Sequence, residues 1–116
     1  MFTLSLRQEY FDAIKSGSKT AEGRPNSSKF KDLKPGMDIC FRSTITNETI
    51  ICSIQGMHVY TNFADMLHQE GIDTMLPGVA SIEQGVALYE SFPGYSDRVK
   101  ECGALAIKIK NSPQLN

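Results

Sequence analysis

The chain has 116 residues, of which 41% are hydrophobic and 22% are charged. This composition is typical of one soluble globular domain, and it excludes a disordered chain, a collagen-like chain and a coiled coil. Twelve basic and thirteen acidic residues give a formal net charge of −1. That balance excludes binding of nucleic acid through bulk positive charge, but it allows a local basic patch.

Neither end of the sequence carries a targeting pattern. We expect no secretory signal, because no apolar run follows a basic start, and no membrane span, because no segment reaches the roughly 20 apolar residues required. The scattered, odd set Cys40, Cys52 and Cys102 argues against a disulfide framework and a zinc knuckle. We therefore expect buried free thiols, no metal or other cofactor, and a cytoplasmic location.

Basic residues concentrate in the first third of the chain. Residues 1–42 hold eight Lys or Arg against five Asp or Glu, whereas residues 43–100 hold two against seven. If a polyanion binds, the first segment should supply the contacts. Its basic residues are Arg7, Lys15, Lys19, Arg24, Lys29, Lys31, Lys34 and Arg42.

Alternating apolar residues over 2–6 predict a half-buried strand. A short helix follows, with apolar residues at helical spacing and an end at Gly17. Residues 20–24 are then expected to be extended, and residues 25–28 to form a loop. A turn at Pro35-Gly36 precedes a predicted hairpin, whose strands cover residues 39–41 and 49–59.

Two more helices and a last strand complete the predicted order. Asn62 is a suitable N-cap for a helix that ends at Gly71, and Ser81 has Gln84 at capping-box spacing for a second helix. Residues 104–110 alternate as the final strand. The pattern predicts an α+β fold in which a mixed, mostly antiparallel sheet with inserted helices closes into a small barrel. We assign residues 1–110 to this single domain and residues 111–116 to a short C-terminal tail.

The densest group of charged side chains follows the first helix. In a strand, Thr20, Glu22 and Arg24 share one face, and Lys19 can reach the same end from the preceding turn. The small residues Ala21 and Gly23 leave the opposite face open to close packing. Two cations and a hydroxyl could bind a phosphate or a polarised carbonyl. On spacing alone, a structural salt bridge at a strand end is the favoured interpretation of the same residues.

Two further residues are candidates for the site. Tyr95, just after Pro93-Gly94, is the aromatic residue best placed to be exposed and to stack on a base. Glu70 lies at a helix C-terminus, where a carboxylate is unfavourable, so it is a candidate for another role. His58 and His68 lack a carboxylate at metal-ligand spacing, which argues against zinc.

These residues form a pattern, Gly17-x-Lys19-x-x-Glu22-x-Arg24, that resembles the signature of the ASCH domain, a member of the PUA-like superfamily. The resemblance covers nearly the whole chain and includes the Phe92-Pro93-Gly94-Tyr95 segment. It implies a small PUA-like β-barrel with helices at its mouth. It also implies a cleft lined by the signature residues, in which ASCH domains are thought to bind RNA or a nucleotide-like ligand.

The resemblance also implies two possible activities. Some relatives hydrolyse the acetyl amide of N4-acetylcytidine with a Lys, a Thr nucleophile and a Glu, which fall on Lys19, Glu22 and near Glu70. This chain therefore lacks the nucleophile at the matching place, and Thr20 is the nearby hydroxyl. Other relatives are ribonucleases.

Three functions follow, in order of preference. The first is binding of single-stranded RNA or a nucleotide through Lys19, Thr20, Arg24 and Tyr95, with no binding of duplex DNA expected. The second is a ribonuclease in which Glu22 is the base, although two neighbouring cations lower its basicity. The third is amide hydrolysis on a modified nucleoside, with Lys19 and Glu70 as catalytic residues. The oligomeric state is left open.

Overall fold

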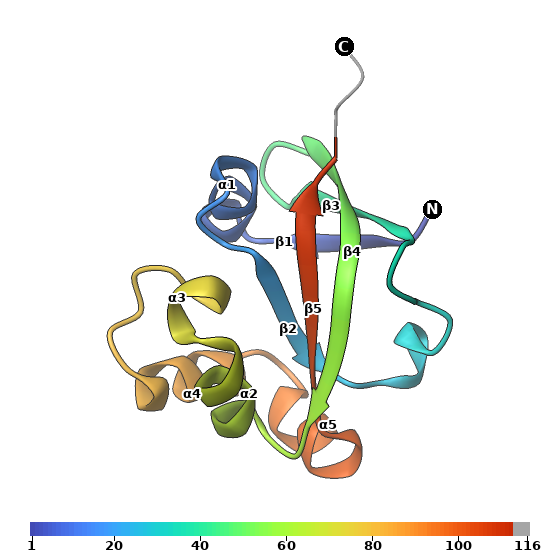
Figure 1. Cartoon of the computed structure of the whole chain (residues 1–116). Coiled ribbons are helices and arrows are strands. Elements are labelled where there is room, and N and C mark those ends of the chain that lie inside the picture. Colours follow the sequence, from blue (N-terminus) through green and yellow to red (C-terminus); the bar gives the residue numbers. More distant parts are fainter. Residues whose placement is uncertain (113–116) are drawn as a thin grey trace.

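A five-stranded sheet organises the chain in the computed structural model, which describes residues 1–112 (Figure 1). Residues 113–116 of the assigned tail lie outside the described residues. The strands are β1 (Thr3–Leu6), β2 (Ala21–Pro25), β3 (Asp38–Ser43), β4 (Thr49–Tyr60) and β5 (Ala104–Asn111). Their order across the sheet is β1-β3-β4-β5-β2. β1 and β3 are parallel, and every other pair is antiparallel.

The helices are inserted between strands, as the sequence predicts. Helix α1 (Gln8–Ser16) connects β1 to β2, and a 3-10 turn, η1 (Ser28–Phe30), follows β2. The remaining helices all lie between β4 and β5 in the chain and gather on one side of the sheet (Figure 1). They are α2 (Phe63–Glu70), α3 (Ile72–Met75), α4 (Ile82–Glu90) and α5 (Tyr95–Cys102). Within the described residues, no helix is both long and apolar enough to cross a bilayer.

The expected α+β sheet is confirmed, but it closes only partly. In the described chain, β1 and β2 are the two edges of the sheet and do not pair with each other. The sheet is therefore a half-barrel. Its open seam is bridged by a side chain, because Arg24 on β2 donates a hydrogen bond from Nη2 to the backbone oxygen of Ser5 on β1, at 3.0 Å.

Two apolar clusters cover the two faces of the sheet. One face packs against α1 and the segment around Phe30, and it includes Ile39, Phe41, Leu105 and Ile107. The other face is formed by small residues, including Ala21, Ala104 and Ala106, and packs against α2 to α4. Because a strand alternates its side chains, Glu22 and Arg24, which flank Gly23 on β2, belong to the first face.

Capping residues set the helix boundaries where the sequence predicts them. Gly17 ends α1 in the left-handed conformation at φ 87°. The side chain of Asn62 accepts a hydrogen bond from the backbone N–H of Asp65 at 2.8 Å, and the Ser81 hydroxyl accepts one from Gln84 at 3.2 Å. The Gln84 side chain in turn accepts from the N–H of Ala80, one residue before the position of a standard capping box.

Two helices were not predicted. Helix α3 has only four residues, which is too short for an apolar period to appear. Helix α5 contains no fully buried residue, and the contact of Tyr95 and Val99 with the second cluster is too short an apolar pattern to predict a helix. As a result, Tyr95 is the first residue of a helix and not part of a loop.

Candidate functional site

Three charged side chains meet at the open seam of the half-barrel. Glu22 and Arg24 lie opposite Ile107 and Leu105 of β5, so they occupy the face of β2 that continues the first apolar cluster. Glu22 Oε2 accepts a hydrogen bond from Arg24 Nε at 2.8 Å, and Glu22 Oε1 lies 3.2 Å from Lys19 Nζ. The predicted convergence of Lys19, Glu22 and Arg24 is therefore present in the structure.

Lys19 is buried and fully engaged. Its ammonium group donates hydrogen bonds to the backbone oxygens of Ala21, at 2.9 Å, and of Met75, and it forms the ion pair with Glu22. An ammonium group has three donors, and these three oxygens use all of them. Burial lowers the pKa of Lys19, and the attraction of Glu22 only partly offsets this effect. Lys19 therefore fixes the start of β2 against α3 and has no free donor for a phosphate.

The carboxylate of Glu22 is ionised although it is buried. Burial alone would raise its pKa, but Lys19 and Arg24 together outweigh that effect and lower the pKa below its usual value. A carboxylate held in this way is a weak base and a strong hydrogen-bond acceptor. Because two cations share one carboxylate, the buried triad has a net positive charge.

A cleft opens beside this triad. Its volume is about 190 Å³. Typical pockets for drug-sized ligands are larger, with volumes of about 300–1,000 Å³. Its walls combine the triad and Arg7 with four aromatic rings, those of Tyr10, Tyr89, Phe92 and Tyr95. Planar apolar walls around a few charged groups are suited to a flat heteroaromatic ligand.

The back of the cleft holds an unsatisfied hydroxyl. Tyr89 is 3% exposed, and its hydroxyl has no hydrogen-bond partner in the described chain. Burial, with Glu22 nearby, raises its pKa well above the usual value, so the hydroxyl keeps its proton. Buried polar groups are nearly always paired. Almost none of the surface of this hydroxyl is accessible, so a ligand in the cleft can pair with it only after a neighbouring side chain moves.

Gly23 allows this arrangement. A Cβ at this position would lie 2.5 Å from Tyr89 Oη and 2.7 Å from Met66 Cε. Only a residue without a side chain lets β2 approach α2 and α4 this closely. The prediction that Ala21 and Gly23 leave one face of the strand open to close packing is confirmed.

Glu70 belongs to a different cluster. Its carboxylate accepts a hydrogen bond from the hydroxyl of Tyr60, lies 2.9 Å from Nδ1 of His58 and lies 3.8 Å from Nζ of Lys108. Burial alone would raise the pKa of Glu70, but these three neighbours lower it. Burial and the bond to Glu70 raise the pKa of Tyr60 to about 12. Glu70 does not line the cleft.

Of the other two predicted site residues, Tyr95 lines the cleft and Thr20 does not. Thr20 is exposed, precedes β2 and does not line the cleft; its backbone pairs with Thr74 and Ile109. Tyr95 does line the cleft. It stacks against Phe63 with ring centroids 6.1 Å apart, which orients its ring.

Sequence reasoning missed several residues that line the cleft. The helical spacing of Tyr89 and Phe92 is typical of core residues, and Tyr89 is indeed buried in the core. Only its unpaired hydroxyl distinguishes it, and no sequence pattern reports whether a hydroxyl has a partner. Tyr10 and Arg7 lie on and before α1, and the open seam brings them to the cleft.

The half-barrel, its four-helix insertion and the charged seam define the class of protein to which the chain belongs. The ASCH domain family model matches residues 4–113, and the chain is a member of the ASCH domain family. The hypothetical protein PH0355 is 37% identical, with a TM-score of 0.84 over 96% of this chain and 98% of that one. Protein PF0455 from Pyrococcus furiosus is 30% identical, with a TM-score of 0.76 over 97% and 98%.

A more distant solved structure shares the fold. The ASCH protein from Zymomonas mobilis is 18% identical, with a TM-score of 0.64 over 93% of this chain and 65% of that one. No curated protein matches the chain. The expected fold class and family are thus confirmed.

Proposed function

We propose that the chain is a binding module for single-stranded RNA or a nucleotide, and that one base enters the cleft at the β1–β2 seam. The observation that carries this proposal is a cleft walled by four aromatic rings beside the charged triad, with the unpaired Tyr89 hydroxyl buried behind its wall. A base can stack on these rings while its polar edge pairs with the hydroxyl. The resemblance to ASCH domains, which implies the same ligand class, supports it.

Glu22 gives the cleft a preference for hydrogen-bond donors. Its ionised carboxylate can only accept, so it favours a base edge that presents amino or imino protons. Tyr89 can donate to a carbonyl or ring nitrogen beside that edge. Recognition therefore uses the polar edge of an unpaired base, which is hidden in a duplex, and this favours single strands over duplex RNA or duplex DNA.

The geometry gives the enzymatic alternatives less support. A ribonuclease would need Glu22 as a base, but Lys19 and Arg24 lower its pKa. An amidohydrolase would need Lys19, a hydroxyl and Glu70 in one place. The donors of Lys19 are all used, and neither Thr20 nor Glu70 lines the cleft. Binding without turnover is the function that these positions favour. A cytoplasmic location, with Cys40, Cys52 and Cys102 all free, is part of the same proposal.

The test compares two conservative variants. Tyr89→Phe removes the unpaired hydroxyl of the cleft, whereas Tyr60→Phe removes the hydroxyl that binds Glu70 outside it. Each protein is titrated with a labelled, mixed-sequence single-stranded RNA and with the matching duplex. The same samples are assayed for RNA cleavage and for deacetylation of N4-acetylcytidine.

We expect wild type to bind the single strand without turnover. Tyr89→Phe should weaken binding about five- to tenfold, as for the loss of one hydrogen bond of about 1 kcal/mol, and Tyr60→Phe should leave it unchanged. Equal binding of RNA by both variants would refute the proposal that a base binds in the cleft. Turnover by wild type would refute a function in binding alone. It would identify the protein as a ribonuclease if RNA is cleaved, or as an amidohydrolase if N4-acetylcytidine is deacetylated.

A further inference from the structure

A second hollow adjoins the cleft. It encloses about 80 Å³, and its lining includes Ser27, Lys29 and Arg98. Arg24 and Tyr95 line both this hollow and the cleft, so the two spaces meet across these side chains. A ligand that stacks in the cleft can therefore extend past Arg24 into the hollow.

The hollow gathers positive charge without neutralising it. Three cations line it, from β2, η1 and α5, and its lining includes no Asp or Glu. Among residues 1–112, neither Lys29 nor Arg98 forms an ion pair, and the partner of Arg24 is Glu22 on the cleft side. Like charges that are brought together without a partner repel one another.

Burial and this repulsion act together on Lys29. Partial burial lowers the pKa of its ammonium group, and the charges of Arg24 and Arg98 lower it further. The side chain of Arg98 is folded back over Gly94, and a Cβ at Gly94 would lie 3.2 Å from the guanidinium carbon. Because the three cations line one small hollow, they lie near one another although they repel, and a bound anion would relieve the repulsion.

We propose that this hollow binds the phosphate group of the ligand whose base occupies the cleft. The inference rests on the proposed function and deepens it, because it assigns the phosphate group of that nucleotide or RNA strand to a site of its own beside the base cleft. Guanidinium groups match phosphate oxygens in pairs, an ammonium group adds a point charge, and the Ser27 hydroxyl adds a neutral donor. The hollow takes over the phosphate-binding role that the sequence assigned to Lys19, whose donors are used within the protein.

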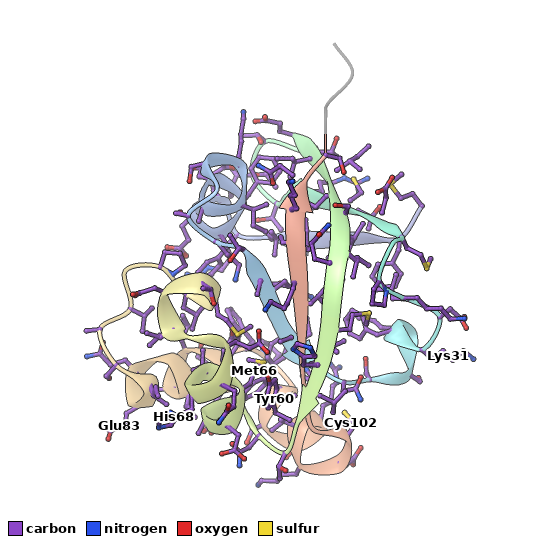
Figure 2. The ribbon with its side chains drawn as sticks, in the orientation of Figure 1. Lys31, Tyr60, Met66, His68, Glu83 and Cys102 are labelled. Carbon is purple, nitrogen blue, oxygen red and sulfur yellow. The ribbon has the colours of Figure 1, made fainter. Side chains whose placement is uncertain are left out.

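The test separates base binding from phosphate binding. Isotope-labelled protein is titrated by NMR with the four ribonucleosides, their 5′- and 3′-monophosphates, inorganic phosphate and a tetranucleotide of single-stranded RNA. The variants are Lys29→Ala and Arg98→Ala. The matched control is Lys31→Ala, because Lys31 does not line the hollow and projects into solvent at the edge of the molecule (Figure 2).

We expect a monophosphate to bind about tenfold more tightly than its nucleoside, as for one added charge-assisted contact. Lys29→Ala and Arg98→Ala should each remove most of this gain and leave nucleoside binding unchanged, while Lys31→Ala should change neither. A tetranucleotide that binds more tightly than every monophosphate would identify a strand as the source of the phosphate. The reverse order would identify a free nucleotide.

Any other result of these titrations refutes the phosphate site, the base cleft or both. If nucleosides and monophosphates bind equally, or if Lys29→Ala and Arg98→Ala behave like Lys31→Ala, the phosphate site is refuted and the base cleft stands. If inorganic phosphate shifts the resonances around Lys29 and Arg98 while nucleosides do not bind, the phosphate site stands and the proposed function is refuted. If no probe binds, both are refuted.

Discussion

Arg24 on β2 and Ser5 on β1 are joined by a hydrogen bond of 3.0 Å between the guanidinium group and a backbone oxygen. The two strands are the unpaired edges of the sheet, so a side chain spans a gap that backbone pairing would otherwise close. The same guanidinium binds Glu22 through Nε and lines both the cleft and the hollow. Arg24 therefore connects the half-barrel to its candidate site.

Replacing Arg24 should destabilise the fold. We expect Arg24→Ala to lower the free energy of unfolding by about 2–3 kcal/mol, because it breaks two hydrogen bonds and leaves Glu22 with one cation. Arg24→Lys should recover only part of this loss, since an ammonium group lacks the planar fork that reaches both oxygens. Urea unfolding measures both values. Arg42→Ala, at an exposed position on β3, is the control and should stay within about 0.5 kcal/mol of wild type.

Gly23 should not tolerate even one methyl group. Gly23→Ala places a Cβ against Tyr89 Oη and Met66 Cε, and we expect it to cost about 1–3 kcal/mol of stability through overpacking. Gly56→Ala is the matched control on β4, where the nearest atom would be Lys108 Cδ at 3.6 Å, an ordinary contact. Thermal unfolding of the two variants should separate them clearly. A stable Gly23→Ala protein would show that α2 and α4 do not pack on β2 as described.

Tyr89→Phe should stabilise the free protein or leave it unchanged while it weakens ligand binding. The hydroxyl has no partner, so its removal relieves a buried unsatisfied group, with an effect of up to about 1 kcal/mol. A hydroxyl that only supported the fold would show the opposite pattern. Melting temperatures with and without RNA measure both effects, and a destabilised free variant would contradict the assignment.

The ion pairs of Glu22 make stability depend on acid pH. Its pKa is lowered in the folded protein, so its contribution is fully present above the unfolded value of about 4.3 and is lost as the pH falls through the folded value. Glu22→Gln should therefore lose less stability than wild type between pH 5 and pH 3, although it is less stable at pH 7. Urea midpoints across this range test the prediction, and parallel pH curves for the two proteins would contradict it.

The order of the strands and the main helices followed from local signals. Alternation identified β1 and β5, Gly17 ended α1, and Asn62 and Ser81 began α2 and α4. Helix α5 was missed because only a short apolar pattern, Tyr95 and Val99, marks the side that packs on the core. The open seam was missed because strand pairing depends on contacts between distant parts of the chain. No residue of β1 indicates that β1 will not pair with β2.

The candidate site was predicted in part, for the same reason. A period of two placed Glu22 and Arg24 on one face, and the triad with Lys19 is present. Sequence could not show that Met75 and Ala21 would use the remaining donors of Lys19, or that α5 would bring Arg98 beside Lys29. Away from the site, Glu83 of α4 is exposed and projects from the helix into solvent (Figure 2).

The claim that a ligand binds at the seam between β1 and β2 is tested most directly by mapping where the ligand binds. An NMR titration of wild-type protein with short single-stranded RNA would map the shifted backbone amides. We predict that the shifts concentrate at Gly23, Arg24 and Tyr95, around the seam between β1 and β2. Shifts confined to the cluster of His58, Tyr60 and Glu70, with the seam unchanged, would contradict the assignment of the cleft.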